Sequence, residues 1–152
     1  MISLADPPRR VLTDRLLLRP YAPDDAAFVK DAVDTSLEHL RTFMDWAWFA
    51  PEPVGVVRKR LRTFRDAFRH GDDWIYGLFE RDGSAIVGGA GLHRRVGPEA
   101  LEIGYWIRAN RVREGLATSV TPGDVAIVSE PKMPPRESVL FAYVRLTVTA
   151  AA

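Results

Sequence analysis

A glycine-containing stretch in the last third of the chain has the residue types of an anion-binding loop. Residues 101–107 (LEIGYWI) are typical of a β-strand, and residues 111–118 (RVREGLAT) follow after a short turn. Small residues at Gly115 and Ala117 would let backbone N–H groups approach an anion closely. The pattern predicts a strand that runs into a pyrophosphate-binding loop. By itself, a Gly-x-Ala pair is more often part of a tight turn, so the residues of the loop leave both interpretations open.

The sequence beyond this loop does not continue as a long helix. Residues 119–123 (SVTPG) would end a helix within its first turns, because proline lacks an N–H group and glycine disfavours helix. Four of the eleven prolines lie between Pro122 and Pro135. One later strand is expected within Val139–Thr149. We therefore treat residues 119–152 as an atypical tail.

Length and composition predict one domain and exclude several kinds of chemistry. The 152 residues are 47% hydrophobic, which suits a single globular domain over 11–152 after a disordered lead-in at 1–10. The chain has no cysteine, which excludes disulfides, thiolate nucleophiles and cysteine-rich zinc sites. His39, His70 and His93 lie far apart without ligand spacing, so no metal site is expected. The formal net charge of +1 gives no global attraction to nucleic acid or membranes.

The termini and the hydropathy favour a cytoplasmic protein. Residues 1–10 have no apolar core of signal-peptide length. No apolar run approaches the roughly 20 residues that are needed to span a bilayer. We expect no membrane partner.

Periodicity places helices and strands around the loop. The clearest helix is Val54–Arg69, whose apolar residues recur at steps of three and four. Asp82-Gly83 predicts a two-residue hairpin turn. The remaining expected strands are Arg15–Pro20 (within Val11–Tyr21), Trp74–Glu80, Ala85–Val96 and Ala100–Arg108. The remaining expected helices are one that Ala22–Asp25 opens and that runs to about Val33, and one at Ser36–Trp46. This order predicts an α+β fold with a mixed, mainly antiparallel central sheet, flanking helices and an incomplete C-terminal half.

The succession of five motifs resembles one protein family. The motifs, in chain order, are DRLLLRP from Asp14, YGLF from Tyr76, VGGAGLH from Val87, EIGYW from Glu102 and GLAT from Gly115. Over residues 11–118 the chain resembles the GNAT N-acetyltransferase superfamily, in its branch of ribosomal-protein-alanine (Rim-type) acetyltransferases. The resemblance implies the acyl-CoA N-acyltransferase fold, acetyl-CoA as cosubstrate and an amine acceptor, either a small molecule or a protein N-terminus.

The resemblance also implies where acetyl-CoA lies. In this family the cosubstrate occupies a V-shaped gap where the fourth strand diverges from the fifth. Trp106 and Ile107 would face the acetyl-pantetheine arm, and a backbone N–H there would polarise the thioester carbonyl. The first loop position, Gln or Arg in the family, falls on Val112, although Arg111 and Arg113 flank it. The resemblance implies that the pyrophosphate contacts Arg113, Glu114, Gly115, Leu116, Ala117 and Thr118.

Two side chains are candidates for taking the proton of the attacking amine. Glu102 on the fourth strand matches a position where this branch often has an acid, and His93 ends the third strand. Glu102 equally fits a solvated surface acid, and His93 fits a structural imidazole. The family's usual tyrosine acid for the leaving thiolate has no clear match, with Tyr143 as a guess.

Other features allow different functions. Trp46, Trp48 and Trp74 fit core packing or the lining of an acceptor pocket. The arginines of helix Val54–Arg69 fit a solvated face or a surface for an acidic partner, whereas we do not expect nucleic acid. Three functions follow: an N-acetyltransferase, an impaired remnant that only binds acyl-CoA, and a binder of acidic partners. Monomer and homodimer both stay open.

Overall fold

The computed structural model describes residues 7, 9–94, 100–114, 116 and 144–147. The strands are β1 (Val11–Leu12), β2 (Leu16–Pro20), β3 (Asp73–Glu80), β4 (Ile86–His93), β5 (Ala100–Ile107) and β6 (Val144–Thr147). The helices are α1 (Ala26–Asp34), α2 (Leu37–Arg41) and α3 (Val54–His70), with short 3₁₀ segments at Pro23–Asp25, Asp45–Phe49 and Ala109–Arg111.

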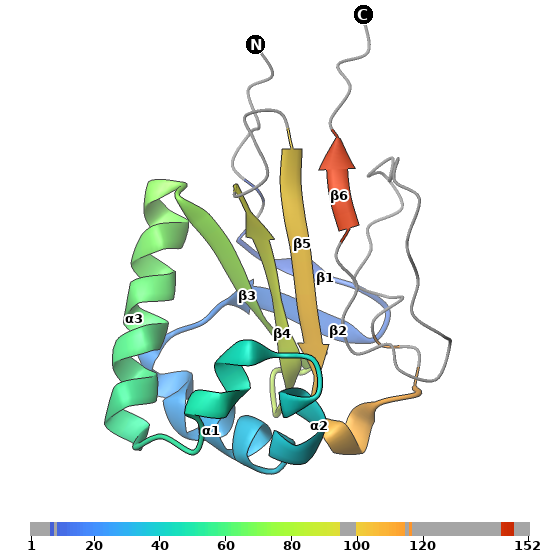
Figure 1. The fold of residues 1–152 in the computed structure, drawn as a ribbon. Coiled ribbons are helices and arrows are strands. Elements are labelled where there is room, and N and C mark those ends of the chain that lie inside the picture. The colour runs from blue at the N-terminus through green and yellow to red at the C-terminus, as the bar shows by residue number, and fades with distance from the viewer. Residues whose placement is uncertain (1–6, 8, 95–99, 115, 117–143, 148–152) are drawn as a thin grey trace, which may run out of the picture.

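The six strands form one sheet in chain order, with each strand antiparallel to its neighbours. Figure 1 shows α3 alongside β3, and α1 and α2 near the end of β5. The expected α+β architecture and the β3–β4–β5 meander are confirmed. The expected parallel component of the sheet does not occur among the described strands.

The strand expected at Arg15–Pro20 is confirmed as β2, and a tight turn joins it to the short strand β1. Thr13 Oγ1 accepts a hydrogen bond from the Leu16 backbone N–H at 2.9 Å, and the Thr13 N–H donates to the Leu16 carbonyl at 2.9 Å. This side-chain bond replaces strand pairing locally and reverses the chain. The short strand β1 is an addition that the sequence analysis did not predict.

The predicted second helix, Ser36–Trp46, is also shorter than expected. Only α2 is helical, and Met44 has an extended backbone (φ −119°, ψ 109°) before the 3₁₀ segment Asp45–Phe49. Leu40, Met44 and Ala47 are all buried in spite of this break. The helical spacing of apolar residues therefore arises from two short segments, α2 and the 3₁₀ segment, that pack into the same core.

Helix α3 matches its prediction closely. Val57, Leu61 and Phe68 are buried toward the sheet. Gly71 ends the helix with a left-handed φ of 73°, and the Asp72 N–H donates to the Ala67 carbonyl at 3.0 Å. This is the glycine-capped end that its sequence favours.

The β3–β4 hairpin has a four-residue loop, Arg81–Ser84, so the prediction of a two-residue turn is wrong. The Glu80 N–H donates to the Ala85 carbonyl at 2.8 Å, and the Gly83 N–H donates to the Glu80 carbonyl at 2.7 Å. Gly83 takes the positive φ of 77° that its sequence favours. A β-bulge follows, because Leu78 pairs with Gly88 while Phe79 pairs with Ile86, which leaves Val87 as an extra residue in β4.

Two apolar clusters lie on the two faces of the sheet. One joins Leu17, Phe79 and Trp106 to α1, α2 and α3. The other gathers Leu16, Trp74, Tyr76, Leu78, Val87 and Ile107. The expected cofactor strand β5 contributes one buried side chain to each cluster, Trp106 to the first and Ile107 to the second.

Other expectations concern parts outside the described residues. Residues 1–6 and 8 of the lead-in lie there, as does most of the tail. Within the expected strand Val139–Thr149, the described part is β6. Tyr143 also lies outside the described residues. Over the described ranges, no helix is both long and apolar enough to cross a bilayer.

Buried tyrosines predict a loss of stability at alkaline pH. Burial raises the pKa of Tyr76 to about 12, and it raises the pKa values of Tyr21 and Tyr105. A pKa raised on folding gives stability that is complete below the unfolded value of about 10 and is lost as pH rises toward the folded value. Phenolate absorbance and loss of circular dichroism should therefore rise together above about pH 10. Titration of these tyrosines near pH 10 with unchanged circular dichroism would contradict this expectation.

Candidate active site

Three ionisable residues form one row across the sheet. In the strand register, His93 at the end of β4 lies opposite Asp73 of β3 on one side and opposite Glu102 of β5 on the other. Residues directly opposite each other project to the same face. Trp106 lies four residues beyond Glu102, so this is the face that carries the helices. Both predicted proton acceptors are thus neighbours, and Asp73 joins them.

His93 has a defined partner in this row. Its Nδ1 lies 2.7 Å from Oδ1 and 2.9 Å from Oδ2 of Asp73. The His93 side chain is 14% exposed and that of Asp73 is 31% exposed. The ring lies over Gly91, because a Cβ at Gly91 would overlap His93 Nε2 and lie 2.7 Å from Cε1. Glu102 is partly exposed beside them.

The outer edge of β5 is only half paired by the described strands. Strand β6 pairs with Ala100–Ile103, and no described strand pairs with residues 104–107 on that side. The Arg108 N–H donates to the Val87 carbonyl at 2.9 Å. Because N–H groups alternate along a strand, those of Tyr105 and Ile107 point to the outer edge. This is where the resemblance places the acetyl-pantetheine arm.

The side chains of Trp106 and Ile107 are packed inside the protein. Trp106 is 9% exposed and stacks edge-to-face with Trp46, with ring centroids 5.9 Å apart. Ile107 is buried in the cluster on the opposite face. Any contact that these two residues make with a ligand at the edge would therefore come from main-chain atoms.

The loop after β5 is only partly described. Arg111 contacts the carboxylates of both Glu80 and Glu114, so its charge is already compensated. Val112 packs against the second cluster, and Leu116 is buried in it. The predicted contacts Gly115, Ala117 and Thr118 lie outside the described residues.

Arg113 and Glu114 are the exposed part of this loop. Arg113 has a left-handed φ of 67°, which turns the chain, and no ion pair involves its side chain in the described part of the structure. The Glu114 carbonyl accepts a hydrogen bond from Arg15 of the β1–β2 turn. Arg113 is thus the cation of the loop that remains available to an anion.

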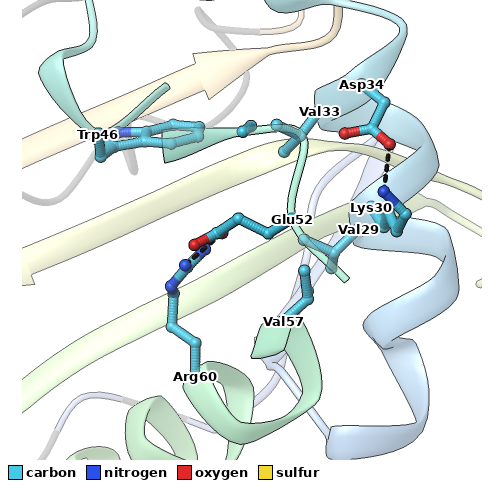
Figure 2. Close-up of a pocket in the computed structure, with 9 residues that line it drawn as sticks. Val29, Lys30, Val33, Asp34, Trp46, Glu52, Val57 and Arg60 are labelled. Carbon is cyan, nitrogen blue, oxygen red and sulfur yellow. Dashed lines mark hydrogen bonds and ion pairs between the residues drawn. The ribbon is translucent and has the colours of Figure 1, made fainter. Parts of the chain in front are cut away.

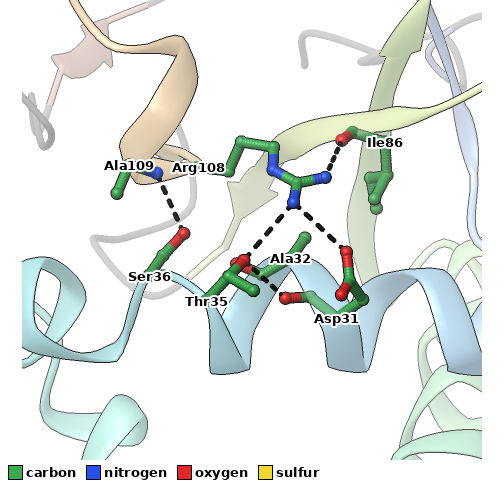
Figure 3. Close-up of polar contacts among 7 residues, drawn as sticks. All are labelled: Asp31, Ala32, Thr35, Ser36, Ile86, Arg108 and Ala109. Carbon is green, nitrogen blue, oxygen red and sulfur yellow. Dashed lines mark hydrogen bonds and ion pairs between the residues drawn. The ribbon is translucent and has the colours of Figure 1, made fainter.

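Arg108 fastens the end of β5 to α1, an arrangement that the sequence did not reveal. Its guanidinium donates to the Ile86 carbonyl at 3.3 Å, to Asp31 Oδ2 at 3.2 Å and to Thr35 Oγ1 at 3.3 Å. The Ala109 N–H donates to Ser36 Oγ at 2.9 Å (Figure 3). We call Arg108, Asp31, Thr35, Ser36 and Ala109 the Arg108 clamp. It fixes where the loop leaves the sheet.

Comparison with known proteins identifies the family. A family model described as an acetyltransferase (GNAT) domain matches residues 15–132. The chain belongs to the GNAT acetyltransferase family. A search of curated protein sequences finds no match.

Solved structures share the fold of this GNAT domain, and several are Rim-type acetyltransferases. RimL, a ribosomal L7/L12 alpha-N-protein acetyltransferase in complex with coenzyme A, has 18% identity and a TM-score of 0.63, and the match covers 72% of this chain and 60% of that one. The microcin C7 self-immunity acetyltransferase MccE, in complex with acetyl-CoA and AMP, has 16% identity and a TM-score of 0.65 over 77% of this chain and 64% of that one.

A third structure is a putative ribosomal-protein-serine acetyltransferase from Vibrio cholerae, with 22% identity and a TM-score of 0.63 over 76% of this chain and 63% of that one. The chain therefore spans about three fifths of the length of these solved structures.

A small crevice between α1 and α3 does not belong to the site. It is lined by Val29, Val33, Trp46 and Val57 together with two charged pairs, Lys30–Asp34 and Glu52–Arg60 (Figure 2). Its volume of about 20 Å³ suits a single water molecule. Of the residues that the sequence analysis considered for a site, Trp46 lines the crevice, and the charges of the crevice are compensated.

The tryptophans that the sequence analysis considered for an acceptor pocket differ in how far they are buried. Trp74 is buried in the core, whereas Trp48 is 67% exposed, so the prediction of core packing is wrong for Trp48.

On α3, Arg60 pairs with Glu52 and Arg65 with Asp66, while Arg58, Arg62 and Arg69 are exposed. Over the described ranges, no group of three or more His, Cys, Asp or Glu side chains could hold a metal ion.

Proposed function

We propose that this GNAT domain transfers an acetyl group from acetyl-CoA to a primary amine, on a protein N-terminus or a small molecule. The observation that carries the proposal is the Asp73–His93–Glu102 row on the face beside the half-paired edge of β5. Protein N-terminal amines are favoured because solved structures of similar fold include RimL, a ribosomal L7/L12 alpha-N-protein acetyltransferase.

The residues of this chain fit acetyl-CoA in part. The outward N–H groups of Tyr105 and Ile107 supply donors for an extended amide-bearing chain, and Arg113 supplies a cation for a phosphate group. Bound acetyl-CoA would supply an activated thioester. The outward N–H groups are the available donors for its carbonyl oxygen.

The acceptor amine must lose a proton when it attacks. Glu102 and His93 are the two side chains of the row that can take this proton, either directly or through water. Positioning of the amine supplies much of the remaining rate enhancement, so few other groups are needed. We place the reaction in the cytoplasm, consistent with a chain that has no cysteine.

Thermal stabilisation by acetyl-CoA tests the binding step. At 100 times the Kd, a ligand stabilises by about 2.7 kcal/mol, which corresponds to roughly 5–10 °C in melting temperature for a domain of this size. Gly115→Asp, which adds a side chain and a negative charge to the loop, should abolish the shift. Ser84→Asp in the β3–β4 loop is the matched control and should retain it. A shift that survives Gly115→Asp would show that acetyl-CoA does not bind this loop.

Thiol release tests the transfer step. Purified protein with acetyl-CoA should release coenzyme A when peptides beginning with alanine or serine, or small primary amines, are added. Binding with zero turnover would instead select the remnant that only binds acyl-CoA, for which the partner-compensated Arg111 and the non-basic Val112 are the supporting observations. If acetyl-CoA gives no melting shift and no thiol is released, the chain is not an acetyltransferase.

A further inference from the structure

We propose that Asp73 is a positioning residue that holds His93 in the tautomer whose Nε2 accepts the proton of the attacking amine. This inference rests on the proposed acetyl transfer and assigns the proton to His93 rather than Glu102. Asp73 has no part in the motifs that identify the family, and its role follows from the strand register and its contact with the imidazole.

The contact between Asp73 and His93 determines which ring nitrogen carries a proton. An ionised carboxylate can only accept hydrogen bonds. Both Asp73 oxygens lie within 2.9 Å of His93 Nδ1. Nδ1 therefore carries the proton and donates a hydrogen bond to Asp73. In the neutral ring, Nε2 then has the free lone pair. A carboxylate in this position also stabilises the imidazolium that forms when Nε2 takes a proton.

The orientation of the ring directs Nε2 along the sheet face. Nε2 lies over Gly91, a residue that has no side chain of its own. Gly91 pairs with Gly104, the first residue of the β5 segment that lacks a described outer partner. The imidazole therefore presents its lone pair toward the part of β5 where the thioester is expected. Glu102 lies on the side of His93 toward the paired half of β5.

The β-bulge in β4 creates this arrangement. With the extra residue Val87, Asp73 lies opposite His93. Without the extra residue, the register set by the Phe79–Ile86 pair would place Asp73 opposite Leu92 instead. A bulge that re-aims a side chain is typical of functional sites.

The charged groups around His93 are few among the described residues. Asp73 faces it from β3 and Glu102 from β5, and Arg145 of β6 lies opposite Glu102 in the register. Arg94 follows His93, but its guanidinium lies 4.6 Å from the Trp74 ring and donates to the Gly71 carbonyl. Asp73 is the charged side chain bonded to the imidazole.

Nitrogen NMR of the imidazoles tests the tautomer without any activity. The chain has three histidines, so His93→Gln assigns the His93 signals by difference. We expect neutral His93 to carry its proton on Nδ1. Asp73→Asn should shift the population toward the Nε2-protonated form, because the amide NH₂ can donate to Nδ1. Asp72→Asn, an exposed neighbour, is the matched control and should leave the spectrum unchanged. A proton on Nε2 in the wild-type protein would overturn the proposal.

A double-mutant cycle tests whether Asp73 acts through His93. We expect His93→Gln to lower kcat by roughly 10²- to 10⁴-fold, and Asp73→Asn by roughly 10- to 100-fold. With His93 already replaced, Asp73→Asn should cost less than about twofold more, while the KM for acetyl-CoA stays within about twofold throughout. The same loss in both backgrounds would show a merely structural role and overturn the proposal.

The dependence of kcat/KM on pH distinguishes whether His93 or Glu102 takes the proton of the amine. The rise of kcat/KM with pH should persist in Glu102→Gln and disappear in His93→Gln. A rise lost in Glu102→Gln but kept in His93→Gln would assign the proton to Glu102. If the wild-type protein releases no thiol with any amine, the proposed function is wrong, and the NMR measurement still decides the role of Asp73.

Discussion

Replacing Gly88 with alanine is expected to destabilise the domain more than any other single glycine substitution considered for this sheet. A Cβ at Gly88 would overlap the carbonyl oxygen of Trp106 and lie 3.1 Å from the Cα of Ile107. Both are backbone atoms of β5, so no rotamer change relieves the clash and the two strands must separate. We expect a cost of about 4 kcal/mol or more, a large part of the 5–15 kcal/mol that typically stabilises a domain.

Thermal and urea unfolding followed by circular dichroism measure this loss. Gly55→Ala is the control, because Gly55 lies in α3 with no atom within 4 Å of the added Cβ. It should stabilise the protein by up to about 1 kcal/mol through helix propensity. A Gly88→Ala protein that melts within a few degrees of the parent would show that β4 and β5 do not approach as closely as described.

Replacing Trp106 with alanine is expected to cost about 3–5 kcal/mol, as for other buried aromatic residues. The indole lies over Gly89, whose added Cβ would be 2.5 Å from Trp106 Nε1, and its ring contacts that of Trp46. The edge-to-face pair contributes about 0.5–1.5 kcal/mol of the total.

Urea denaturation of Trp106→Ala and Trp46→Ala distinguishes a core role from a cofactor role. Trp46 is 38% exposed, so its replacement should cost clearly less than that of Trp106. The resemblance assigned Trp106 to the acetyl-pantetheine arm. A Trp106→Ala protein that keeps its stability but loses acetyl-CoA binding would support that assignment against the buried position described above.

The elements that the sequence predicted best are those in which one periodic signal decides the structure. In α3, the steps of three and four from Val57 to Phe68 coincide with the buried face, and Gly71 marks the end. Strand β1 was not predicted, because one hydroxyl, that of Thr13, bonds to the backbone and reverses the chain before β2. Such a side-chain bond leaves no periodic trace in the sequence.

The site was predictable only where a family motif covers it. His93 and Glu102 were found in this way, and the sheet brings them together as neighbours. Asp73 was missed because its contact with His93 depends on the extra residue Val87. Counting back from the Asp82-Gly83 turn, without the bulge, pairs the wrong residues. Arg108 was missed because its partners, Asp31 and Thr35, lie more than 70 positions away in the sequence.

The Arg108 clamp has a consequence for hydrogen exchange. Because it joins the end of α1 to the start of the loop after β5, neither segment can open to solvent alone. Amide hydrogens in residues 31–36 and 108–111 should exchange for deuterium at a shared rate. A ligand held by the loop should therefore slow exchange in α1, even though it touches no atom of that helix.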